Sequence, residues 1–177
     1  MPYPLLRLLL LLCLPLLTLA CEKEPLDLLD ELVPATQEGA NTLGCLIDGE
    51  VFYNRGGSIG VPDITSSYGT VGNKRLSIAA FDISTSGSVD REAILLYFEN
   101  FQVGGYRPLI PYKVIDIRAS GVSEEYEIYL QHSFEFIITN YDAINRIASG
   151  RFSFTAINKS NGLLKIITDG RFDVKYQ

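Results

Sequence analysis

The chain has 177 residues, with 15 basic and 21 acidic side chains and a net charge of −6. This acidic balance argues against nucleic-acid binding, because such proteins need a basic surface that displaces the counterions of the phosphate backbone. The single histidine, His132, leaves too few nitrogen ligands for a zinc centre. The length is that of one domain.

Residues 1–20 have the pattern of a secretory signal. Arg7 precedes the apolar run Leu8–Leu17, and the small residue Ala20 stands directly before Cys21. This arrangement resembles the bacterial lipobox, which implies cleavage before Cys21 and attachment of diacylglycerol to its sulfur. The alternatives are a cleaved signal with an incidental Cys21, or a retained membrane helix. The helix is disfavoured, because Pro15 interrupts a run shorter than the roughly 20 residues that span a bilayer.

Cleavage at this point leaves 157 residues, whose side chains include 14 basic and 21 acidic groups. Cys13 departs with the signal and Cys21 is expected to carry lipid, so Cys45 has no disulfide partner within the chain. Cys45 lies in the apolar run Leu43–Ile47, which predicts a small buried hydrophobic side chain. The alternative, a reactive thiol, lacks a nearby cation in the sequence to lower its pKa.

Residues 21–42 are predicted to be a lipidated tether. Leu26–Val33 is long enough for two helical turns, and Pro34 ends them. The following residues, 35–42, are small and polar and show no periodicity. We expect this segment to lie over the domain or to lead up to it.

From Leu43 onward, short alternating runs separated by turn residues predict antiparallel strands. Leu43–Ile47 and Glu50–Tyr53 flank Asp48-Gly49, a strong hairpin signal, and Asn54–Ser67 is predicted to be a loop. Ala93–Val103 is apolar on both faces, so we expect a central strand that is covered on each side. Further strands are expected at Arg75–Ser84, Val114–Ile117, Tyr126–Leu130 and Phe134–Thr139.

The last third of the chain has the clearest alternation. Arg151–Ile157 places Phe152, Phe154 and Ala156 on one face, and residues 158–162 form a turn. Leu163–Thr168 is expected to form the returning strand, and Asp169-Gly170 is expected to turn the chain again. The final strand has Phe172, Val174 and Tyr176 on one face. Its other face has Arg171, Asp173 and Lys175. The sequence therefore predicts a three-stranded meander at the end of the protein.

Eight to ten short strands in residues 43–177 predict an all-β fold, a single antiparallel β-sandwich. A closed, calycin-like barrel is the alternative, because it requires the same alternation. The sandwich is preferred, since several strands are apolar on one face only and few residues suit the lining of a deep cavity.

Three stretches resemble a known family. Leu32–Gly49, Ile147–Phe154 and Ile166–Tyr176, which contains the closing motif ITDGRFDVKY, resemble segments of an uncharacterised lipoprotein family of the Bacteroidota that carries a domain of unknown function. The resemblance covers essentially the whole mature chain. It implies lipidation, a location in the cell envelope and β structure, and it supplies no catalytic residues. Glu22-Lys23-Glu24 resembles the charged residues that follow the Cys in Bacteroidota lipoproteins exported to the outer face, so we expect a location at the outer membrane.

The residues offer little for catalysis or cofactor binding, so we expect no enzyme, metal or cofactor. His132 is expected at a strand end, and no nucleophile elbow occurs. Gly56–Gly60 lacks the lysine of a phosphate loop. An ion site at Asp169–Arg171 with Asp173 is the alternative to a hairpin turn flanked by surface charges. Carboxylates that could serve glycoside cleavage are expected instead to solvate a strand end; they are Glu124, Glu125 and Glu127.

Aromatic residues are the better functional signal. The chain has ten tyrosines and nine phenylalanines, and the tyrosines in or beside predicted loops can stack on a sugar or contact a protein. They are Tyr53, Tyr68, Tyr106, Tyr112 and Tyr141. A recognition module for a glycan or a protein predicts exposed rings gathered at one loop end. A structural lipoprotein predicts an apolar surface patch, and a carrier of a small apolar ligand predicts an enclosed cavity.

Overall fold

The computed structural model describes residues 29–54, 64–69, 75–82, 91–100, 102–105, 113–117 and 123–177, with the backbone alone for 91 and 113–117. The signal at 1–20, Cys21, the Gly56–Gly60 segment, Tyr106 and Tyr112 lie outside these residues. The described part contains no helix of the length and hydropathy needed to cross a membrane. Leu29 and Asp30 are helical, within the segment where two helical turns were predicted.

The described residues form eleven strands, all paired antiparallel. Their bounds are β1 (Thr42–Ile47), β2 (Glu50–Tyr53), β3 (Ile64–Gly69), β4 (Arg75–Asp82), β5 (Arg91–Glu99), β6 (Gly104–Gly105), β7 (Lys113–Ile117), β8 (Ser123–Ile128), β9 (Phe134–Asp142), β10 (Ile147–Ile157) and β11 (Leu164–Lys175).

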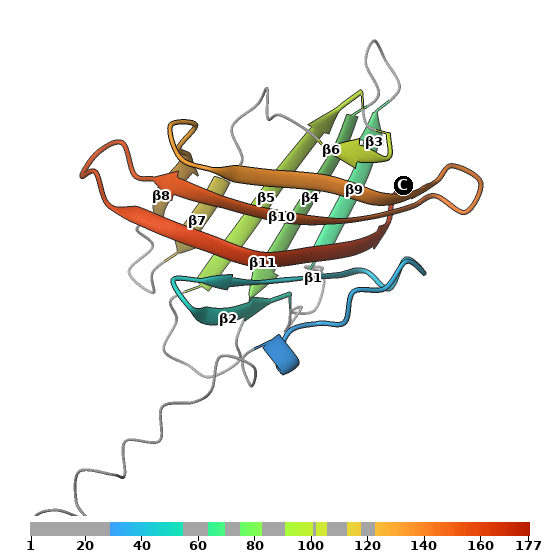
Figure 1. Ribbon diagram of the computed structural model, residues 1–177, viewed down its shortest axis with the longest axis horizontal. Coiled ribbons are helices and arrows are strands. Elements are labelled where there is room, and N and C mark those ends of the chain that lie inside the picture. Colours follow the sequence, from blue (N-terminus) through green and yellow to red (C-terminus); the bar gives the residue numbers. More distant parts are fainter. Residues whose placement is uncertain are drawn as a thin grey trace, which may run out of the picture.

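The strands are arranged in two layers joined at a corner. The hydrogen-bonded path runs β2-β1-β11-β10-β8-β7-β5-β4-β3, and β9 pairs with β10 and β6. Figure 1 shows β9, β10, β11, β1 and β2 as a front layer, with β3, β4, β5, β7 and β8 crossing behind it. The corner is β10, which pairs with β9 up to Phe154 and with β8 at Ala156 and Ile157.

The path is open, because β2 and β3 at its two ends are not hydrogen-bonded to each other. The expected antiparallel β-sandwich is therefore confirmed, and the alternative of a closed barrel is wrong. The edge strand β3 instead contacts the last residues of the chain. The Tyr68 N–H donates to the Gln177 carbonyl over 3.0 Å, and the Ser66 hydroxyl donates to the Lys175 carbonyl over 3.1 Å.

The core lies between the layers and is rich in aromatic rings. Phe98 of the back layer lies 6.4 Å from Phe136 and 5.6 Å from Phe172 of the front layer, measured between ring centroids. Such edge-to-face and tilted contacts suit the quadrupoles of aromatic rings. The predicted inward residues of β10 are confirmed, since Phe152, Phe154 and Ala156 are all buried. Cys45 is also buried, as expected.

Two strand predictions in the middle of the chain need correction. The inner face of β5 (Ile94, Leu96 and Phe98) is buried, but the strand ends at Glu99 and Val103 is 61% exposed. Asn100, with a φ of 53°, takes a left-handed conformation that ends the extended run.

A loop was predicted through Ser67, yet β3 begins at Ile64. This edge strand is rich in serine and threonine and only half-buried on one face, so its hydrophobic signal is weak.

The Asp-Gly pair of β11 does not turn the chain as predicted. β11 is one strand of 12 residues, and Asp169 (φ 53°) lies inside it. The pairing register shifts in both neighbouring strands at this level, which identifies a β-bulge. Pairing with β10 on one side and β1 on the other holds both halves in line. The predicted meander is therefore replaced by two long strands, whereas Asp48-Gly49 does form the predicted hairpin turn between β1 and β2.

Several of the described tether residues, 29–42, contact the domain. Leu32 is buried at 6% exposure, and Val33 packs where a side chain on Gly44 would otherwise stand. The Asn41 side chain accepts a hydrogen bond from the Lys175 N–H over 2.9 Å. The expectation that this segment lies over the domain is confirmed for these residues.

Candidate functional site

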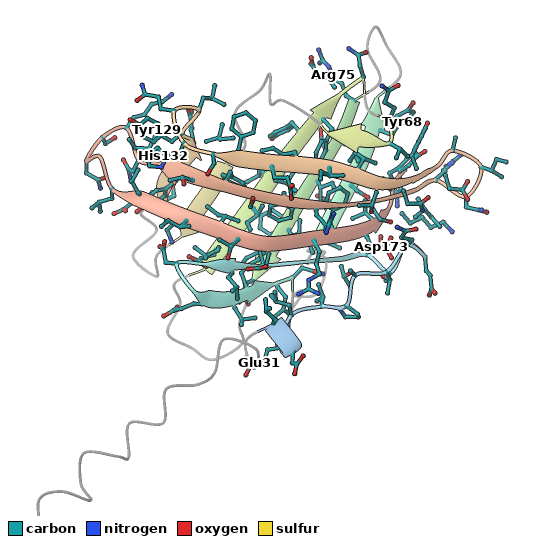
Figure 2. All side chains as sticks on the ribbon, in the orientation of Figure 1. Glu31, Tyr68, Arg75, Tyr129, His132 and Asp173 are labelled. Atoms are coloured by element: carbon teal, nitrogen blue, oxygen red, sulfur yellow. The ribbon has the colours of Figure 1, made fainter. Side chains whose placement is uncertain are left out.

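Three tyrosines from separate segments of the chain meet at one end of the sandwich. Tyr68 belongs to β3, Tyr141 to β9, and Tyr176 follows β11. They line a pocket of about 420 Å³, together with Ala143, Arg146 and Gln177. We call this the tyrosine pocket. Figure 2 shows Tyr68 at the end of the sandwich opposite to Tyr129 and His132.

The three rings form a connected group. The Tyr176 centroid lies 5.0 Å from that of Tyr68, in a tilted contact, and 6.4 Å from that of Tyr141, in a stacked one. Tyr176 is 4% exposed, whereas the other two rings are half-buried. The Tyr176 N–H also donates to the Arg146 carbonyl over 2.9 Å. One ring is therefore anchored in the core, and two present part of their surface to solvent.

The phenols of Tyr68 and Tyr176 remain neutral well above pH 7. Burial, followed by a hydrogen bond with Tyr141, raises the pKa of Tyr68 and that of Tyr176. Neutral phenols keep their O–H groups and can both donate and accept hydrogen bonds. The pocket can thus stack against a ligand and hydrogen-bond its hydroxyl groups.

The β9–β10 turn, residues 143–146, forms the rim of the pocket. The Asp142 carboxylate accepts the N–H groups of Ile144 and Asn145, each over 2.9 Å. These hydrogen bonds, led by the one from the Asn145 backbone, lower the pKa of Asp142. Arg146 takes a φ of 60°, and Ile144 is 91% exposed. The turn therefore brings a cation, Arg146, to the pocket, whereas Ile144 projects into solvent.

The sequence identified two members of this pocket and missed others. Tyr68 and Tyr141 were among the predicted loop tyrosines, and the structure brings them together. Tyr176 was assigned only to a strand face, because the meeting of β3 with the end of the chain is not visible in local sequence. Tyr53, a further predicted ring, ends β2 and does not line the pocket.

The other candidates lie elsewhere. His132 is in the β8–β9 turn, with its ring centroid 4.8 Å from that of Tyr129. Two of the carboxylates are engaged, since Glu124 accepts from the Tyr126 hydroxyl and Glu127 pairs with Lys159. Burial, with a smaller contribution from Glu92, raises the pKa of Cys45, which is the free thiol of the described part. The residues that the structure describes contain no group of three or more candidate metal ligands.

One charged residue is buried, although the sequence predicted it at the surface. Asp173 was predicted among surface charges but is 1% exposed, because the tether covers it. Its carboxylate accepts hydrogen bonds from the hydroxyls of Thr36 (2.6 Å) and Ser149 (2.8 Å). It also accepts the N–H groups of Glu38 (2.9 Å), Gly39 (2.9 Å) and Ala40 (3.1 Å). We call this arrangement the carboxylate clasp.

Burial alone would raise the pKa of Asp173, but the hydrogen bonds from Thr36, Ser149, Ala40 and Glu38 outweigh it and hold the pKa below its ordinary value. The Asp173 carboxylate is thus charged at neutral pH, and all the donors that it binds belong to the chain itself. These hydrogen bonds explain why the polar residues of the tether lie on the sheet. The clasp is structural, and the tyrosine pocket is the better candidate for a ligand.

No family model, curated protein or solved structure matches the chain. The candidate site therefore stands on its geometry.

Proposed function

We propose that the protein is a lipid-anchored, non-enzymatic recognition module of the cell envelope, and that its tyrosine pocket binds a glycan. The secretory signal and Cys21 support the anchor. The resemblance to envelope lipoproteins supports a location at the outer membrane. The acidic net charge of −6 is consistent with a partner other than nucleic acid.

The grouping of Tyr68, Tyr141 and Tyr176 around one open pocket is the observation that carries this proposal. The apolar faces of sugar rings stack on aromatic rings, and their hydroxyls take hydrogen bonds from phenols. Arg146 adds guanidinium donors at the rim. This combination of apolar surface with a few polar groups is characteristic of small-ligand sites.

A structural or accessory lipoprotein is the second candidate. Leu164 and Ile166 lie on the same face of β11 and are 43% and 54% exposed, respectively, and Leu163 beside them is 57% exposed. This apolar surface suits contact with an envelope protein. A carrier of a small apolar ligand has less support, because rings of the two layers contact each other across the core.

The glycan proposal is tested by screening the full chain against a glycan array and titrating the best ligand. Tyr68→Ala and Tyr141→Ala should each weaken binding roughly two- to ten-fold, the range expected for loss of one ring contact. Tyr129→Ala is the matched control, because it removes a ring at the opposite end of the sandwich. Binding that survives the double variant, or that falls equally with Tyr129→Ala, would reject the pocket as the site.

The anchor is tested separately by metabolic labelling with a fatty acid. The native chain should take up label, and Cys21→Ser should abolish it. Cys13→Ser, which also removes a thiol from the N-terminal region, should leave labelling intact. An unlabelled native protein would contradict the anchor while leaving glycan binding open to its own test.

A further inference from the structure

The tripeptide Gly-Arg-Phe occurs twice, at residues 150–152 and 170–172. The two copies lie on the adjacent antiparallel strands β10 and β11, in matching register. Gly150 is opposite Phe172, Arg151 is opposite Arg171, and Phe152 is opposite Gly170. The pairing therefore has local two-fold symmetry, with the two arginines at its centre.

The inner face shows why both copies need glycine. A Cβ on Gly170 would lie 2.5 Å from the Phe152 ring, and one on Gly150 would lie 2.6 Å from the Phe172 ring. Each ring thus packs over the glycine of the other strand, and both rings are buried in the core. This interlocked packing fixes the local register and directs the two arginines together to the outer face.

Arg151 and Arg171 face each other across the strand pair. Like charges directly opposite each other on paired strands repel. Within the part of the chain that the structure describes, neither Arg151 nor Arg171 has a carboxylate within 4.0 Å. By contrast, Arg75 on the back layer forms an ion pair with Glu99, with 3.0 Å between Nε and Oε1.

The arginines line a hollow of about 770 Å³ on the outer face of the front layer. The hydroxyl-bearing residues Ser153 and Thr168 line it from the strands, and Leu29 and Ala35 line it from the tether. Three carboxylate residues, all exposed to solvent, also belong to the lining: Asp30, Glu135 and Asp169. We call this site the arginine hollow.

We propose that the arginine hollow is an oxyanion site that binds a phosphate group. A guanidinium presents a planar fork of N–H donors that matches two oxygens of a phosphate. Two such forks on facing strands can hold one group between them, and the bound charge removes their mutual repulsion. The hollow shares no lining residue with the tyrosine pocket, so this inference stands independently of glycan recognition. The phosphate can be free, or it can be the diester of a lipid headgroup.

The test is calorimetric titration of the full chain with inorganic phosphate and with glycerophosphoglycerol, a soluble phosphodiester headgroup. We expect saturable binding of at least one probe. Arg151→Ala and Arg171→Ala should each weaken it about ten-fold or more, the loss expected for hydrogen bonds to a charged group. Arg75→Ala is the matched control, because it removes the same charge from the other layer (Figure 2) and should leave binding unchanged.

The two probes distinguish the sources. Binding of inorganic phosphate alone identifies a free oxyanion as the ligand, and binding of the diester identifies a headgroup. The absence of saturable binding by either probe overturns the proposal, as does an equal loss with Arg75→Ala, which would indicate general charge attraction. Urea unfolding of each variant checks that a loss of binding is not a loss of the fold.

Discussion

Asp173 and Arg171 lie two residues apart on the same face of β11, yet their charged groups have opposite environments. Asp173 is 1% exposed and accepts hydrogen bonds from five donor groups, four of them on the tether. Arg171 faces another arginine across the strand pair, in an open hollow. The tether covers the part of this face that contains Asp173. The adjoining part, which contains Arg171, lines the open arginine hollow. A charge satisfied within the fold contributes stability, whereas an unsatisfied one is suited to binding a solute.

Replacing Asp173 should have the largest effect on stability. Asp173→Ala leaves five buried or part-buried donors without their acceptor, so the free energy of unfolding should fall by about 3 kcal/mol. Urea denaturation measures the loss, and limited proteolysis should show faster cleavage within residues 36–40. Asp173→Asn keeps the shape of the side chain but loses its charge. Its free energy of unfolding should therefore lie between that of the native protein and that of Asp173→Ala. A change in stability no larger than that of a surface substitution would contradict the clasp.

The interlocked glycines should give the next largest effect. Gly170→Ala places a methyl group 2.5 Å from the Phe152 ring and from the Phe152 carbonyl oxygen, so we expect a loss of about 2 kcal/mol. Gly69→Ala is the control, since its nearest neighbour would be 3.9 Å away, and it should change stability by less than about 0.5 kcal/mol. Equal unfolding midpoints for the two variants would show that the rings do not pack on the glycines as described.

Acid should release the clasp. Because the folded pKa of Asp173 lies below that of the unfolded chain, its contribution to stability is full above the unfolded pKa of about 3.9. It is lost as the pH falls through the folded pKa. The stability advantage of the native protein over Asp173→Asn should therefore be constant near neutral pH and shrink below about pH 4. Urea midpoints measured for both proteins across this range provide the test, and an advantage that grows in acid would refute the assignment.

The smallest expected effect is a gain in stability, and it comes from replacing Arg171. Arg171→Ala removes a like-charge contact with Arg151, so stability at low salt should rise by up to about 0.5 kcal/mol. Arg75→Ala removes an ion pair with Glu99 and should lower stability by about 0.3 kcal/mol. Thermal unfolding at two salt concentrations resolves these changes, since salt should reduce both. A clear destabilisation by Arg171→Ala would show that the guanidinium has a structural partner.

The sequence predicted what depends on local alternation. The inward rings of β10, the Asp48-Gly49 hairpin and the sandwich class all follow from a period of two and from turn residues. The bulge at Asp169-Gly170 could not be told from a hairpin, because both require the same positive backbone angle. Only pairing with strands on both sides distinguishes them.

Contacts between segments that are far apart in the chain could not be predicted from local sequence patterns. The burial of Asp173 depends on tether residues more than 130 positions away in the sequence. Tyr176 joins Tyr68 and Tyr141 only because β3 contacts the end of the chain. The repeated Gly-Arg-Phe was visible in the sequence, but its meaning required the register that places Arg151 opposite Arg171.

The contrast between the two charged positions is tested most directly by NMR of the full chain during addition of inorganic phosphate and, in parallel, glycerophosphoglycerol. We predict that the guanidinium Nε–H signals of Arg151 and Arg171 move together and reach saturation with one of the probes. The carboxyl carbon signal of Asp173 should remain in place, because its acceptor positions are already filled by the chain. Guanidinium signals that stay unchanged with both probes, or an Asp173 signal that moves with them, would contradict this account.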